Sequence, residues 1–136
     1  MKFVKEYRRG GELIALLVKR EFQEGPPAKH ATFVSMDNQS LQLGIGNYPS
    51  GLVAPRHTHR KVRKAARYEE LIHQIRGRMK VELYGKDKVK FASFVMRPGD
   101  TVQFMSGGHG FKMLGPCKCL EIKQGPYSGK INKEVF

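Results

Sequence analysis

Apolar and polar residues alternate along much of the chain with a period of two. Met79, Val81 and Leu83 interleave with polar neighbours, and residues 90–96 alternate in the same way. Because successive side chains of a β-strand point to opposite faces, each of these stretches predicts a strand with one buried face.

Glycine and proline recur between these stretches and leave little room for a long helix. Gly77 and Gly85 bracket one strand, as turns bracket consecutive antiparallel strands. Turn signals spaced about every 8–12 residues are typical of an all-β sandwich or barrel. The predicted strands are Glu12–Lys19, Ala31–Met36, Leu41–Tyr48, Leu52–His59, Glu70–Arg76, Arg78–Tyr84, Val89–Met96, Thr101–Phe104, Gly110–Leu114 and Lys118–Lys123.

Length and composition predict one globular domain over residues 1–136. The chain has 136 residues, of which 40% are hydrophobic and 27% charged, and no linker or repeat divides it. The longest apolar run, Leu13–Val18, is too short to cross a membrane and is followed by charged residues rather than a cleavage site. We therefore expect a cytoplasmic protein.

The segment His57-Thr58-His59 is the clearest candidate for chemistry. Two histidines at this spacing point to the same side of an extended strand, so that both imidazoles can reach one metal ion. A carboxylate such as Glu70 and a third imidazole such as His109 would complete a mixed nitrogen and oxygen set. Such sets hold one divalent transition metal, among which iron, manganese, nickel and zinc all fit.

The order of these residues resembles the two motifs of the cupin superfamily. Gly51 precedes the histidine pair by the motif's spacing, Gly77 follows Glu70, and a Pro-Gly-Asp sequence at residues 98–100 precedes His109. The resemblance covers residues 41–127 and is closest to small single-domain bacterial cupins, some of which accompany sugar pathways. It implies an antiparallel double-stranded β-helix, the jelly-roll barrel, and a homodimer.

Residue by residue, the resemblance implies the metal ligands His57, His59, Glu70 and His109. Glu69 competes with Glu70, but its side chain is expected on the opposite face of the strand, as is that of His73. Ten residues separate His59 from Glu70, which is longer than the spacing in the family motif.

The inserted residues form the most basic part of a chain whose formal net charge is +13. Residues 56–67 contain six basic residues and no acid. Arg60, Arg63 and Arg67 are therefore candidates for binding a small anionic ligand beside the metal. Because the chain lacks a recognisable nucleic-acid-binding motif and its charge is spread widely, a nucleic-acid partner is the weaker interpretation.

The last predicted strand carries Glu121 and Lys123 on one face, together with Cys119. If this face points inward, the two charged residues form an ion pair near the pocket or act as catalytic acid and base. If it points outward, they are surface charges. Cys117 and Cys119 lie too far apart along a strand for a relaxed disulfide.

The leading hypothesis is a metal-binding cupin that acts on or holds a small anionic molecule. The molecule would be a sugar phosphate, a sugar nucleotide or a carboxylate, and the reaction would be sugar isomerisation or epimerisation, or oxygen-dependent cleavage at an iron centre. Two alternatives stay open: a ligand-binding or sensor cupin without catalysis, and a basic nucleic-acid-binding barrel.

Overall fold

The computed structural model describes residues 2–24, 26–35, 39–53, 55–57, 69–123 and 134–136. Within these ranges the chain is all-β, with one 3-10 turn, η1 (Arg20–Glu24), and no α-helix. Every pairing between these strands is antiparallel, which confirms the predicted all-β, antiparallel class. The strands are β1 (Val4–Arg9), β2 (Glu12–Val18), β3 (Thr32–Phe33), β4 (Gly44–Ile45), β5 (Glu70–Arg76), β6 (Met79–Tyr84), β7 (Lys90–Met96), β8 (Thr101–Phe104), β9 (Gly108–Met113) and β10 (Lys118–Lys123).

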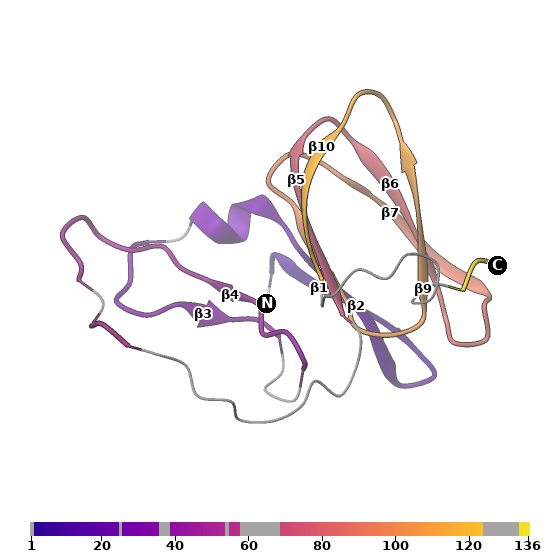
Figure 1. The fold of residues 1–136 in the computed structure, drawn as a ribbon, viewed down its shortest axis with the longest axis horizontal. Helices are drawn as coiled ribbons and strands as arrows, with labels where there is room; N and C mark the ends of the chain where they lie inside the picture. Colours follow the sequence, from indigo (N-terminus) through magenta and orange to yellow (C-terminus); the bar gives the residue numbers. More distant parts are fainter. Residues whose placement is uncertain (1, 25, 36–38, 54, 58–68, 124–133) are drawn as a thin grey trace.

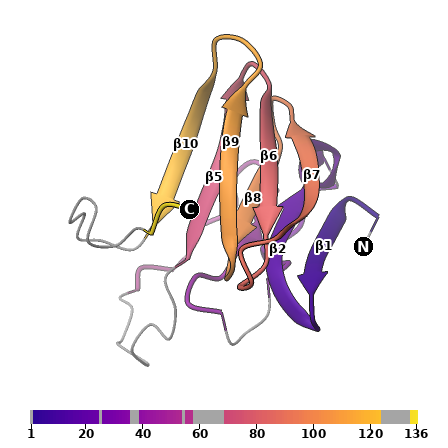
Figure 2. The same ribbon diagram turned by 90° about the vertical axis from the view of Figure 1, so that its right-hand side faces the viewer.

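Two sheets form the body of the molecule (Figures 1 and 2). The main sheet has the order β1-β2-β8-β5-β10, and the second sheet has the order β7-β6-β9. The short β3-β4 pair lies on the other side of the main sheet. Among the described residues no hydrogen-bonded strand pairing joins the two sheets, so the strands that are described form two layers rather than a closed barrel.

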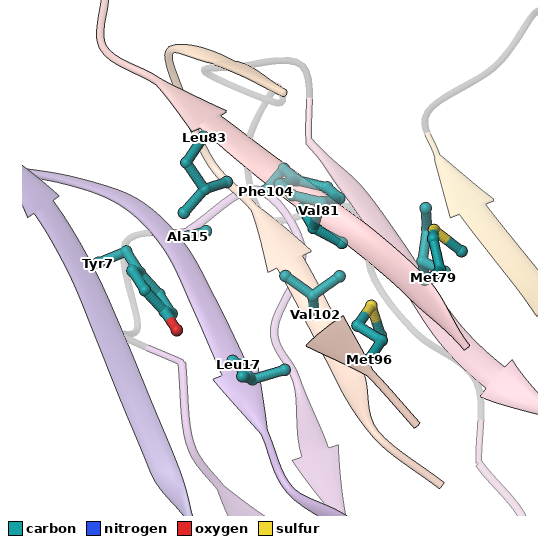
Figure 3. Packing of buried hydrophobic residues seen from close by; sticks show 10 residues of the cluster. Tyr7, Ala15, Leu17, Met79, Val81, Leu83, Met96, Val102 and Phe104 are labelled. Atoms are coloured by element: carbon teal, nitrogen blue, oxygen red, sulfur yellow. The ribbon is translucent and has the colours of Figure 1, made fainter. Parts of the chain in front are cut away.

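The central hydrophobic core fills the space between the two sheets (Figure 3). Met79, Val81 and Leu83 of β6 are at most 1% exposed, as their alternation predicts. They pack against residues such as Leu17 and Val102 of the main sheet. Full burial of each such side chain contributes about 1.5–3 kcal/mol, so this layer holds the two sheets together.

A second core covers the opposite face of the main sheet. Leu16 and Val18 of β2 are buried there, and the segment that carries β3 and β4 packs against them through Val34, Leu43 and Ile45. Both faces of β2 are therefore covered. This explains why residues 13–18 read as one apolar run rather than as an alternation.

The prediction was least accurate before residue 60. Of the described residues in Ala31–Met36 and Leu41–Tyr48, only two in each are strand, in β3 and β4. The described residues of Leu52–His59, which are 52–53 and 55–57, form no strand, so the assumption that His57 lies on one was wrong. Closely spaced prolines and glycines interrupt the hydrogen-bonded ladder over this segment. β1 was missed because Tyr7 is its only fully buried side chain.

The turn between β5 and β6 requires glycine at position 77. Gly77 has φ +76°, and a methyl group there would collide with the Pro116 carbonyl oxygen of the neighbouring loop. We therefore expect Gly77→Ala to lower the free energy of unfolding by about 1–2 kcal/mol, measured by urea denaturation. Gly10→Ala is the matched control because Gly10 also has positive φ but no atom near its missing Cβ. Equal losses in the two variants would contradict a role for the Pro116 contact.

Candidate functional site

Glu70 and His109 meet between the two sheets, although 38 residues separate them in sequence. Glu70 begins β5 in the main sheet, and His109 lies in β9 of the second sheet. His109 Nε2 is 3.2 Å from Glu70 Oε2, and their side chains are only 25% and 13% exposed. The structure thus brings together two of the four predicted metal ligands at one end of the sandwich.

Aromatic rings hold the His109 imidazole in place. The Phe104 ring stacks on it at a centroid distance of 3.9 Å and an interplanar angle of 17°, and the Phe111 ring lies 5.1 Å from it. Phe104 is itself 4% exposed and is the register partner of Glu70. A buried core residue therefore fixes the plane of the imidazole and presents its Nε2 to the carboxylate.

Strand β10 adds charged side chains to the same face. Lys123 is the register partner of Glu70, and Glu121 is the partner of Ile72, whose side chain belongs to the central core. Lys123 Nζ lies 3.1 Å from Glu121 Oε1. Both side chains lie on the Glu70 face of the sheet, yet they stay partly exposed, at 32% for Lys123 and 45% for Glu121.

The surroundings of Glu70 keep its carboxylate charged. Burial opposes ionisation, but the hydrogen bond with His109 and the nearby charges of His109 and Lys123 outweigh it, and the pKa of Glu70 is lowered to about 2. Burial, together with the neighbouring Glu121, Cys117 and Glu70, raises the pKa of Cys119. At neutral pH the site therefore offers an anionic carboxylate next to a protonated thiol.

The other predicted ligands are not joined to this pair in the part of the chain that is described. The Nδ1 atom of His57 lies 2.9 Å from the carbonyl oxygen of Pro55. His59 and the predicted anion-binding residues Arg60, Arg63 and Arg67 fall outside the described residues. Within the described ranges, no group of three or more His, Cys, Asp or Glu side chains is arranged to hold a metal ion.

The two competing residues lie where strand alternation predicts. Glu69 is fully buried and accepts a hydrogen bond from the backbone N–H of Leu41, on the side of the main sheet that faces the β3-β4 segment. His73 lies on that side too, with Nδ1 2.8 Å from Thr101 Oγ1. Neither side chain joins the face that carries Glu70 and Glu121.

Comparison of this chain with family models, curated proteins and solved structures finds no match. No helix in the described residues is long and apolar enough to span a membrane.

The aromatic residues of the site were missed at the sequence level. Phe104 and Phe111 were not predicted to contact His109, although each lies within five positions of it. Only residues 105–107 connect β8 to β9. A connection this short keeps Phe104, at the end of β8, close to β9, and it was the signal in the sequence that Phe104 lies near His109.

Proposed function

We propose that this chain is a cupin-type protein that binds one divalent transition metal and holds a small anionic molecule beside it. The metal ligands would be Glu70 and His109, joined by His57 and His59 from the segment that leads into β5. The observation that carries the proposal is the approach of Glu70 Oε2 and His109 Nε2 across the two sheets.

The geometry of this pair fits a shared cation. Two ligand atoms that each lie about 2.1 Å from one metal ion, at right angles, are about 3.0 Å apart. The observed separation of 3.2 Å is close to this value. Glu70 is anionic at neutral pH and the His109 ring is held by Phe104, so both ligands are available without a large rearrangement.

The order of the strands supports a place for the remaining two ligands. β9 is the last strand of the second sheet in the described pairing, so one edge of the strand that carries His109 is open to a further strand. The chain passes from His57 to Glu70 through 12 intervening residues. Because residues 55–57 form no strand, this segment would have to pair along the β9 edge on metal binding for His57 and His59 to lie alongside His109, as the cupin resemblance implies.

Basic residues that neighbour Glu70 in register or in sequence support an anionic ligand. Lys123 faces Glu70, and Arg60, Arg63 and Arg67 lie in the segment immediately before β5. A sugar phosphate, sugar nucleotide or carboxylate carries the complementary charge. A bound metal would polarise an oxygen of such a ligand, while Glu121 and Lys123 would transfer protons as acid and base.

A second candidate is a cupin that binds the anion without turnover. Glu121 and Lys123 pair with each other at 3.1 Å, so each partly neutralises the charge of the other. Under this alternative the pair positions the ligand and no bond is made or broken. Turnover assays with sugar phosphates, comparing the wild type with Glu121→Gln, separate the two candidates.

The metal proposal is tested by titrating the metal-free protein with Mn²⁺, Fe²⁺, Ni²⁺ and Zn²⁺ in a calorimeter. We expect one ion per chain for the wild type and a loss of affinity of about 100-fold in Glu70→Gln and in His109→Ala, because each removes a ligand. His73→Ala is the matched control, since His73 occupies the opposite face of β5. A wild type that takes up none of these ions, or variants that bind as tightly as the control, would contradict the proposal.

A further inference from the structure

A charged hollow lies at the far end of β5 from Glu70. Its volume is about 470 Å³, and it is bounded by the start of η1, the β5-β6 turn and the loop between β7 and β8. Four basic and two acidic side chains line it: Lys19, Arg20, Arg78, Arg97, Glu21 and Asp100.

One of the two carboxylates is already committed within the protein. Asp100 is 3% exposed, and its Oδ2 accepts hydrogen bonds from Lys19 Nζ at 3.0 Å and from the backbone N–H of Arg97 at 2.9 Å. Its Oδ1 accepts from the backbone N–H of Arg20 at 3.4 Å. The charge of Lys19 is thereby balanced by Asp100.

The three arginines carry more charge than the remaining carboxylate can balance. No ion pair joins the guanidinium of Arg20, Arg78 or Arg97 to an acid within the described part of the chain. Glu21 is the one remaining carboxylate among the described residues that line the hollow. The hollow therefore has an excess of two positive charges, which is the charge that a dianion neutralises.

The backbone beneath these arginines is held in place. The loop between β7 and β8 is bonded to the end of β5, because Gly99 N–H donates to Gln74 O at 2.8 Å and Gln74 N–H donates to Asp100 O at 2.9 Å. Gly99 has φ +92°, and the Arg20 side chain packs where its Cβ would be. The two segments that carry Arg20 and Arg97 are thus fixed against each other.

We propose that this hollow binds a small phosphorylated molecule through the guanidinium groups of Arg20, Arg78 and Arg97. Planar guanidinium groups make paired hydrogen bonds to phosphate oxygens, and a phosphoryl dianion matches the excess charge better than a single carboxylate. The arginines come from three separate segments and converge on one hollow, which suits a compact anion rather than an extended polymer. This site and the Glu70–His109 pair lie at opposite ends of β5.

Calorimetric titration of the full chain with inorganic pyrophosphate, in metal-free buffer at fixed ionic strength, tests this site. We expect one pyrophosphate per chain and affinity about tenfold lower in Arg78→Gln and in Arg97→Gln. Glu21→Gln is expected to raise the affinity about threefold, since it removes the opposing charge. Arg8→Gln is the matched control, because Arg8 lies in β1 opposite Leu13, far from the hollow along β2, and carries the same charge.

Two further measurements distinguish this proposal from its alternatives. Glu70→Gln and His109→Ala are expected to bind pyrophosphate as the wild type does, so this proposal and the metal proposal fail independently. Loss of binding in either variant would overturn the assignment to the hollow. Equal losses of pyrophosphate affinity in Arg78→Gln and Arg8→Gln would also overturn it, as would a wild type that binds no pyrophosphate at millimolar concentration. Tighter binding of a ten-residue oligothymidylate that pyrophosphate does not displace would overturn it too.

Discussion

Phe104→Ala is expected to lower the free energy of unfolding by about 3–5 kcal/mol, because it removes a whole aromatic ring from the core. Phe104 is 4% exposed in the central core and packs against His109 and Phe111. Removing the ring leaves a cavity between the two sheets that neighbouring side chains fill only in part. Urea denaturation followed by circular dichroism measures the loss.

Phe104→Leu separates the packing role of this residue from its role at the site. Leucine keeps most of the buried volume, so we expect a stability loss below about 1.5 kcal/mol. It lacks a planar face for the His109 imidazole, so metal affinity should still fall severalfold. A variant with wild-type metal affinity would show that the ring stack at 3.9 Å does not position His109.

Asp100→Ala is expected to cost about 2–4 kcal/mol, because several donors lose their acceptor at once. The buried carboxylate accepts from the backbone N–H groups of Arg97 and Arg20 and from Lys19 Nζ. The backbone donors are part-buried, and water reaches them only if the loop between β7 and β8 moves. Thermal and urea denaturation should both report the loss.

Asp87→Ala is the matched control for this substitution. Asp87 also pairs with a cation and with a backbone N–H, but its side chain is 48% exposed. Exposed ion pairs contribute about 0–1 kcal/mol, so the control should lose much less stability than Asp100→Ala. Comparable losses would mean that burial of Asp100 does not matter to the fold.

Among the strands after residue 69, β6 was the most predictable because one of its faces is buried. Met79, Val81 and Leu83 alternate with half-exposed residues, and this contrast is what a period of two detects. The β3 and β4 region was not predictable in the same way. This region contributes the apolar side chains of Val34, Leu43 and Ile45, which cover the second core. Its backbone forms only a short hydrogen-bonded ladder between β3 and β4.

The candidate site was predictable in its residue types and only partly in its geometry. Glu70 and His109 could be paired from motif order, and the structure places them 3.2 Å apart. Whether Glu121 and Lys123 share the face of Glu70 could not be chosen from sequence, because alternation alone does not say which faces of two strands coincide. The register of β10 on β5, which sets Lys123 opposite Glu70, decides it.

An anomalous-difference map from crystals of the protein, loaded with the ion that binds most tightly in the titration, tests the metal proposal at the level of atoms. We predict one peak per chain, within about 2.0–2.2 Å of both Glu70 Oε2 and His109 Nε2, with His57 and His59 completing its coordination. A fully loaded crystal whose only peaks lie away from Glu70 and His109 would contradict a metal site at this pair.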